Sequence, residues 1–412
     1  MILQYLIRQS ANPQSANPLI ILFSYLLQML NRLKISILLL LLTVMSYAND
    51  TLLSKQLLNR IETLQAKESS VFPKGSFPSY RIYALNKDRE KADINAFYTG
   101  LVAMTLQDLS SRLSGAQQLQ AQQIINNTFP VYQKFQNQKG RPTYNFWQTD
   151  TPRIFPNAGW LNVFDKAQAL PDDLDDTVIM LLALNAQDST AKKVHALMQQ
   201  FTNNGEKRVH NTFKDYRNIG AYSTWFGKKM PVDFDVCVLA NILYFVQRYN
   251  LEWTTADSAS LQLIEKVLAE KKHITDAPYV SPHYSRLPNI LYHLSRLMSV
   301  KPIASLEKLK PQLIEDAKNA LAKTNNFMDE VILSTSLLRW GAEPPEMKVH
   351  EANSLQELIE EGSFSFFIAN MASMLPDPLK QWMGGAGVGK FYYDCAGYNN
   401  LLFLEYLSLQ RK

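Results

Sequence analysis

The sequence contains only two cysteines, Cys237 and Cys395, among its 412 residues. Two thiols are too few for the disulfide framework that holds many small secreted domains together. Both cysteines lie in apolar segments with helical periodicity, which favours two small buried thiols. A single disulfide between them in an oxidising compartment is the alternative. We therefore expect two free, buried cysteines.

A strong charge of either sign is also absent. The formal net charge is +5, and no basic stripe is present, so nothing in the sequence supports binding to nucleic acid. Histidine is scarce as well. The remaining histidines beside His283 show none of the spacings typical of metal ligands, which makes a zinc site improbable. They are His195, His210, His273, His293 and His350.

Acidic residues are missing altogether from residues 1–48. A short positive stretch begins at Met29, an apolar run follows at 35–44, and the small residues at 46–48 fit a signal cleavage site. We expect residues 1–48 to be a signal segment, residues 49–412 to be one domain, and the protein to be periplasmic or secreted. The alternative is an uncleaved inner-membrane anchor, and the membrane would then be contacted only through this segment. Charges in the middle of such an anchor would be costly.

The alternation of apolar and polar residues that is typical of strands is scarce, whereas helical periodicity runs through almost the whole chain. Two kinds of helix alternate. The polar, amphipathic kind is expected at 51–67, 115–137, 188–203, 256–271, 304–323 and 354–374. The more apolar kind is expected at 92–113, 172–186, 233–249, 284–299, 327–340 and 394–408. Six outer and six inner helices predict an all-α fold, an (α/α)6 toroid, with an open helical solenoid as the competing architecture.

Long aromatic loops precede two of the inner helices, at 141–170 and 211–226. Long loops inside a compact domain are usually functional. Their aromatic side chains, Trp147, Tyr222 and Trp225 among them, can line a pocket for an apolar chain, stack on sugar rings, or cap the core. The fourth inner helix starts near His283 and Tyr284, which we add to the candidate substrate-binding residues.

A glycine-rich stretch, Gly384 to Lys390, matches the G-x-x-x-x-G-K pattern of phosphate-binding loops. The next residue is Phe391, where such a loop needs a serine or threonine to bind Mg²⁺, and no strand is expected before it. We expect these glycines instead to form a loop that approaches another part of the backbone closely and leads to the last inner helix.

Acidic residues gather at the starts of two inner helices. The segment 171–178 carries four aspartates in five positions, and a similar acidic segment recurs 60 residues later. Proline and aspartate suit the first turn of a helix, so these can be simple helix starts. The repetition in register instead suggests a repeat fold whose acidic helix starts face one common opening. The matched pairs are Pro171 and Pro231, Asp173 and Asp233, Asp175 and Asp235, and Val178 and Val238.

The stretch Asp173-Leu174-Asp175-Asp176-Thr177 resembles the Asp-x-Asp-Asp-Thr signature of class II terpenoid cyclases. Those enzymes are built on α/α toroids, and the signature begins an inner helix. The resemblance implies that Asp175 is a general acid that protonates an alkene or epoxide, with Asp173 and Asp176 in support. It covers five residues, and the Gln-x-x-x-Gly-x-Trp repeats of triterpene cyclases are absent. A carboxyl among other carboxyls in an apolar opening can keep its proton near neutral pH.

Two other classes of function fit the same residues. Exported (α/α)6 toroids include glycoside hydrolases and polysaccharide lyases, in which Asp175 and Asp235 would form the carboxylate pair for a glycan substrate. A non-catalytic binding or scaffold toroid would use the acids as helix caps. We expect no organic cofactor, although clustered aspartates, including Asp233, can bind Mg²⁺ or Ca²⁺ as well as hold a proton.

Overall fold

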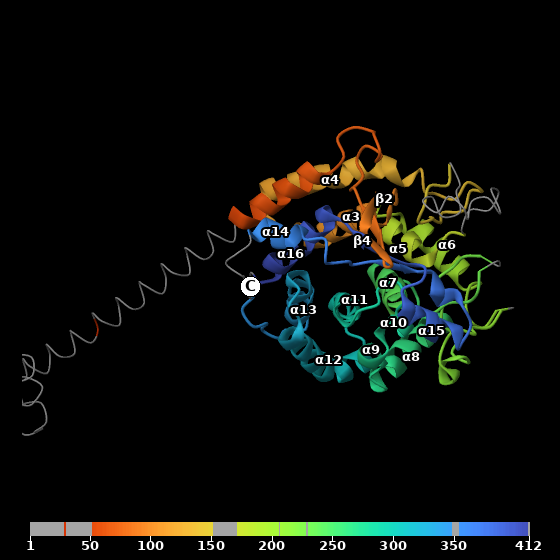
Figure 1. The fold of residues 1–412 in the computed structure, drawn as a ribbon. Coiled ribbons are helices and arrows are strands. Elements are labelled where there is room, and N and C mark those ends of the chain that lie inside the picture. Colours follow the sequence, from red (N-terminus) through yellow and green to blue (C-terminus); the bar gives the residue numbers. More distant parts are fainter. Residues whose placement is uncertain are drawn as a thin grey trace, which may run out of the picture. The chain divides into compact units, whose positions relative to one another are not determined.

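The computed structural model describes Met29 and residues 52–150, 171–205, 207–227, 230–347 and 354–410 (Figure 1). The expected signal segment, apart from Met29, lies outside the described residues, and so do residues 151–170, the last two thirds of the first aromatic loop. The chain divides into two units, Met1–Gln56 and Leu57–Lys412, and the fold below is that of the second. No helix in the described part of the chain is both long and apolar enough to cross a membrane.

The second unit is mainly helical, which confirms that part of the expected fold. Each segment that we expected to be an inner, more apolar helix contains one. Buried apolar residues occupy most positions of these helices, as expected for helices without a solvent face. They are α3 (Phe97–Leu109), α5 (Leu174–Ala183), α7 (Val236–Arg248), α11 (Leu287–Val300), α13 (Phe327–Arg339) and α16 (Ala396–Gln410).

The expected outer helices also form, with one exception. Residues 57–64 are helical, and α4 (Gly115–Tyr132), α6 (Asp188–Met198), α8 (Thr255–Ala269) and α12 (Ala304–Lys323) follow. The exception is the helix expected at 354–374, which was wrong for most of its length. Helix α14 (Leu355–Glu360) starts with a Ser354 capping box, but the chain then turns at Gly362 and becomes extended. The aromatic residues that follow favour an extended chain over a helix.

A four-stranded antiparallel sheet corrects the expectation of an almost purely helical domain. Its strands are β1 (Tyr80–Tyr83), β2 (Asn86–Ala92), β3 (Ile368–Asn370) and β4 (Lys390–Asp394), in the order β2-β1-β4-β3. Tyr80 pairs with both Ala92 and Asp394, so the sheet joins an early part of the chain to a late one. The strands are short and β2 is mostly charged, which leaves almost no apolar alternation in the sequence to reveal them.

The inner helices pack against one another in chain order: α3 against α5, α5 against α7, α7 against α11, α11 against α13, and α13 against α16. Helix α16 also packs against α3. Shorter helices complete the described part: η1 (Ser110–Arg112), η3 (Lys214–Tyr216), α9 (Lys272–Thr275), α10 (Ala277–Val280), η4 (Met371–Met374) and α15 (Leu379–Ala386).

Two smaller expectations can be checked in this fold. Cys237 and Cys395 are both free and buried, as expected. The first residues of the glycine-rich stretch end α15, and residues 387–389 connect this helix to β4 and not directly to the last inner helix, as we expected. A phosphate-binding loop instead connects a strand to a helix. Gly389 has φ of +71°, and a Cβ atom there would lie only 3.0 Å from the Cβ of Met371. Glycine therefore allows the close approach that the sequence indicated.

Candidate functional site

The acidic start of α5 is buried. Asp173 is its N-cap, and one carboxylate oxygen accepts a 2.6 Å hydrogen bond from the backbone N–H of Asp176. An aspartate in this position satisfies a helix N–H that would otherwise lack a partner. Asp172, just before it, accepts hydrogen bonds from Asn137 and Thr143. Two of the four aspartates are thus engaged in local structure.

Asp175 is held by two side chains from distant parts of the sequence. Asn241 on α7 donates to Oδ1 over 2.6 Å, and the Tyr284 hydroxyl donates to Oδ2 over 2.5 Å. Burial raises the pKa of Asp175 to about 7, helped by the charges of Asp173 and Asp235 and opposed by the two hydrogen bonds. Asp175 therefore changes its protonation state near neutral pH.

Asp176 is the more strongly protonated neighbour. Burial raises its pKa well above the ordinary range, and the charge of Asp173 and a hydrogen bond to that carboxylate add to the shift. The pKa of Asp173 is also raised by burial, although the hydrogen bond from Asp176 works in the opposite direction. The pair therefore shares one proton, held mainly by Asp176. Oδ1 of Asp176 is buried and has no hydrogen-bond partner among the described residues.

The second acidic start, at α7, is organised differently. Asp235 is the N-cap, and its Oδ1 accepts from the backbone N–H groups of Cys237 and Val238 and from the Ser281 hydroxyl. Its Oδ2 accepts a 2.8 Å bond from the backbone N–H of His283. Both oxygens are therefore used. Burial raises the pKa of Asp235 despite these bonds and the charge of His283.

Asp233 belongs to a separate buried cluster. Its Oδ1 accepts from Asn211 over 2.8 Å and lies 3.9 Å from Nζ of Lys380, and its Oδ2 lies 3.5 Å from Nε2 of His283. Burial lowers the pKa of His283, but the nearby carboxylates of Asp233, Asp235 and Asp173 outweigh it and raise the pKa. The imidazole thus gains positive character next to the acids.

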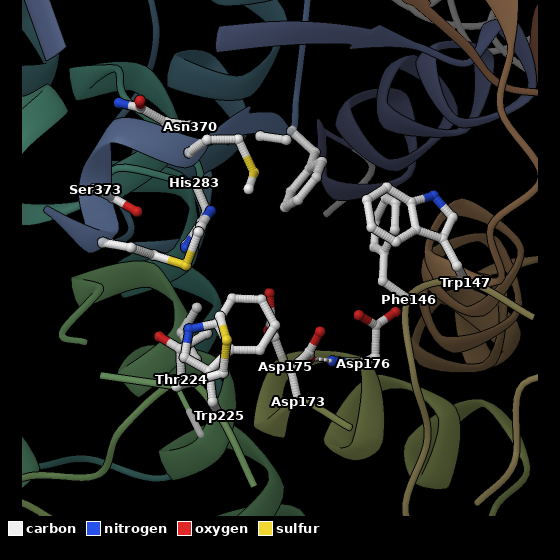
Figure 2. A pocket seen from close by; sticks show the side chains of 16 residues that line it. Phe146, Trp147, Asp173, Asp175, Asp176, Thr224, Trp225, His283, Asn370 and Ser373 are labelled. Carbon is white, nitrogen blue, oxygen red and sulfur yellow. Dashed lines mark hydrogen bonds between the residues drawn. The ribbon is translucent and has the colours of Figure 1, made fainter. Parts of the chain in front are cut away.

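A pocket opens over the start of α5, with about 660 Å³ of empty space including its opening. Figure 2 shows the carboxyls of Asp173, Asp175 and Asp176 on one side and Asn370 and Ser373 across the space from them. Most of the lining is apolar or aromatic. It consists of Phe146, Trp147, Asp173, Asp175, Asp176, Thr224, Trp225, Met230, Val238, His283, Phe367, Ala369, Asn370, Met371, Ser373 and Met374.

Some of the expected site residues line the pocket, but others do not. Trp147, Trp225 and His283 line it with the three α5 acids, whereas Asp233, Asp235, Tyr222 and Tyr284 are not among its lining residues. Tyr222 is fully buried, and its hydroxyl donates to Asp257 in the core. Tyr284 is fully buried beneath Asp175. The two acidic starts nevertheless lie close together. Helix α5 packs against α7, and the two aspartates accept hydrogen bonds from the neighbouring residues Ser281, His283 and Tyr284.

Sequence reasoning missed one wall of the pocket and one polar partner. Residues 367–374 line the side opposite the α5 acids, but they lie in the segment that we expected to be a helix. Asn241 is the partner missed beneath Asp175. The sequence could have indicated this residue, because Asn241 is the one amide side chain in the otherwise apolar run from Val236 to Val246. A buried amide usually has a hydrogen-bond partner that explains its presence.

Within the described part of the chain, no group of three histidine, cysteine, aspartate or glutamate side chains is arranged to hold a metal ion. Three carboxyls with raised pKa values lie at an apolar pocket, an arrangement that can donate a proton. A search against protein-family models, curated proteins and solved structures found no match to this chain.

Proposed function

We propose that this protein is an enzyme that starts its reaction by protonating an apolar substrate, with Asp175 as the general acid. The observation that carries the proposal is the buried carboxyl of Asp175, with a pKa raised to about 7, on the wall of a pocket lined mainly by apolar and aromatic side chains. General acids work best when their pKa lies near the operating pH. The resemblance of residues 173–177 to class II terpenoid cyclases points to the same chemistry.

The reaction step balances without a cofactor. Asp175 gives its proton to one carbon of a carbon–carbon double bond, whose electron pair forms the new C–H bond and leaves a carbocation on the other carbon. A second double bond can attack this cation, which forms a carbon–carbon bond and moves the positive charge to another carbon. Loss of a neighbouring proton to a base then ends the sequence with a new double bond, and the carboxylate is reprotonated. Aromatic rings stabilise nearby cations, and Phe146, Trp147, Trp225 and Phe367 line the pocket.

The charge of the pocket favours a neutral substrate over an anionic one. An anionic group such as a diphosphate would approach the partly ionised cluster of Asp173, Asp175 and Asp176 and be repelled. A neutral isoprenoid or another neutral apolar alkene would not be repelled by these acids.

We also propose that the helices form the (α/α)6 toroid expected from the sequence. Support comes from the order of contacts, because each inner helix packs against the next and α16 packs against α3. The sheet strengthens this interpretation, since β1 near the start of the unit pairs with β4 near its end. In a toroid of this kind, the starts of α5 and α7 would share one end of the ring.

The glycan-enzyme alternative is less well supported by the geometry. Glycosidases place two carboxyls on opposite sides of the scissile bond, with open space between them. Here the three pocket acids come from a single helix start, and Asp235 is not among the residues that line the pocket. A non-catalytic binding protein remains as an outcome of the test below.

The test is incubation of the purified protein with squalene and with geranylgeraniol in detergent micelles, with products analysed by gas chromatography and mass spectrometry. We expect a rearranged or cyclised product from one of these neutral polyenes and none from Asp175→Asn. Asp188→Asn is the matched control, because Asp188 is an exposed aspartate in the first turn of α6. Binding of the polyene to both proteins without conversion would contradict the enzymatic proposal and favour a binding protein.

A further inference from the structure

A buried polar chain runs from the acid into the helical core. Arg296 on α11 donates through Nη2 to Oδ1 of Asn241 over 2.5 Å, and Asn241 donates through Nδ2 to Oδ1 of Asp175 over 2.6 Å. Asn241 is 2% exposed and Arg296 is 3% exposed. Helices α7 and α11 pack together, which brings these two residues into contact although 55 positions separate them.

Arg296 is an unusual residue for a helical core. A buried charge is costly unless it is paired. Arg296 forms no ion pair among the described residues, and its Nε and Nη1 atoms lack hydrogen-bond partners there. The rings of Tyr244 and Tyr292 lie 5.5 and 5.6 Å from the guanidinium and offset part of the cost. Packing alone would be served as well by methionine, so the charge calls for another explanation.

The guanidinium determines which way the Asn241 amide points. Arginine has only donors, so the amide oxygen must face Arg296 and the amide N–H groups must face Asp175. If the amide were turned over, its oxygen would face a carboxylate oxygen and oppose ionisation of Asp175. A neutral residue at position 296 would leave both orientations available.

We propose that Arg296 is a positioning residue for the acid: it holds the Asn241 amide in the orientation that donates to Asp175, and its charge favours the carboxylate left behind after proton transfer. This inference rests on the proposed role of Asp175 as a proton donor. A better-stabilised conjugate base makes Asp175 a stronger acid, which protonation of an alkene requires. Asn241 transmits the effect, because Arg296 makes no hydrogen bond to Asp175 itself.

Other titratable groups face Asp175 and enter any measurement of its proton. Asp173 and Asp176 lie on its own helix start, and α7 contributes Asp235 and Cys237. Tyr284 lies just before α11. Helix α3, which also packs against α5, carries Tyr98 and Asp108, but these bond to the Tyr393 carbonyl and the Tyr244 hydroxyl. His283, whose raised pKa gives it positive character, lines the pocket with Asp175, so Arg296 is the only arginine or lysine in this set of described residues.

The experiment measures the proton on Asp175 directly and needs no substrate. The full chain is labelled with ¹³C-aspartate, and the protonated-carboxyl band of Asp175 is identified by infrared difference spectroscopy against Asp175→Asn. We expect Arg296→Met to move the titration midpoint of Asp175 upward by about one pH unit or more, a tenfold weaker acid. Arg296→Lys, which retains a charge and only donors, should restore part of the shift.

Arg339→Met is the matched control. Arg339 is also buried and stacks over Tyr292 at 4.5 Å, but its partner is Glu405 and it makes no hydrogen bond to Asn241. We expect this variant to be less stable while the midpoint of Asp175 stays in place. An equal shift in Arg339→Met would mean that any disturbed core moves the midpoint, and it would overturn the proposal.

Asn241→Asp keeps the inference testable if Arg296→Met does not fold. An aspartate at 241 gives Arg296 a buried partner but has no N–H to donate to Asp175, so the midpoint should rise at least as far. An unchanged midpoint in Asn241→Asp or in Arg296→Met contradicts the inference. Failure of the substrate test alone would remove the catalytic role of Asp175 without affecting this titration, so the two claims can be separated.

Discussion

The two acidic helix starts, at α5 and α7, share a sequence pattern but differ in their surroundings. Asp235 accepts two backbone N–H groups of its own helix, the Ser281 hydroxyl and the backbone N–H of His283. Asp175 accepts no backbone N–H and is held only by the side chains of Asn241 and Tyr284, at the pocket. The same residue type therefore serves as a helix cap in one copy, whereas in the other it lies at the pocket and is held by side chains alone.

The difference arises because the two helices begin at different positions of the shared motif. In the first copy the N-cap is Asp173, so Asp175 falls inside the first turn. In the second copy the N-cap is Asp235, so the equivalent of Asp175 is itself the cap, and Asp233 moves out of the helix. A shift of two residues in where the helix begins thus changes the role of every acid in the motif.

The largest expected effect is a difference in turnover between substitutions of the two matched aspartates, Asp175 and Asp235. Asp175→Asn keeps the size of the side chain and removes the exchangeable proton, so turnover of a converted polyene should fall by roughly 10²-fold or more. Asp235→Asn should retain most of the turnover, because asparagine is also a good N-cap and residue 235 is not part of the pocket lining. Initial rates of product formation measure both. Equal losses in the two variants would remove the distinction.

The free energy of unfolding should depend more on Asp235 than on Asp175, the reverse of the order expected for activity. Asp235→Ala leaves four donors without their acceptor, two of them at a helix start, and should lower the free energy of unfolding by about 2–4 kcal/mol. Asp175→Asn should leave it unchanged or raise it, because a buried acid that is costly to ionise is removed. Urea denaturation at pH 7 provides the comparison. A larger loss in Asp175→Asn would indicate a structural acid or a metal ligand.

The pH dependence of stability sharpens this comparison. The folded-state pKa of Asp175, about 7, lies above its ordinary value of 3.8, so between these values the folded protein holds a proton that the unfolded chain releases. Raising the pH through this window therefore destabilises the parent by at most about 1.4 kcal/mol per pH unit, and the loss is complete above pH 7.

Asp175→Asn has no carboxyl at this position, so it does not lose stability as the pH rises through this window. Its free energy of unfolding, relative to the parent, should therefore increase from about pH 4 to about pH 7 and then stay level. Urea denaturation in a series of buffers measures the difference. A difference that does not change with pH would mean that Asp175 has no raised pKa in the folded protein.

The smallest expected effect concerns divalent cations. If the acids of the α5 start hold protons, Mg²⁺ and Ca²⁺ at millimolar concentrations should leave the melting temperature of the parent nearly unchanged. A ligand that binds the folded state raises the melting temperature, so a clear increase that chelator reverses and Asp175→Asn abolishes would identify a metal site instead. Differential scanning fluorimetry is sufficient for this measurement.

Local pattern in the sequence was enough to locate the helices and the acidic starts. Apolar periodicity identified α5, α7 and α13, and the repeated proline and aspartate identified the beginnings of the first two. It did not reveal β2, whose charged residues carry no apolar alternation, or the wall at 367–374, where a helical pattern gave way to an extended chain after Gly362.

The roles of the individual acids were beyond the reach of local pattern. They depend on partners 46 to 109 positions away, which only the packing of neighbouring helices brings together. These are Asn241 and Tyr284 for Asp175 and Ser281 for Asp235. The sequence predicted that both acidic starts face one common opening, but Asp233 and Asp235 are not among the residues that line the pocket.

The most direct test of this account is the protonation state of the two matched aspartates in the parent protein. Infrared spectra of the ¹³C-aspartate-labelled chain are taken at about pH 6, and the spectra of Asp175→Asn and Asp235→Asn are subtracted in turn. The account predicts that Asp175→Asn removes a protonated-carboxyl band whose intensity falls with a midpoint near pH 7. The absence of that band in the Asp175→Asn difference at pH 6, or an equal band in the Asp235→Asn difference, would contradict it.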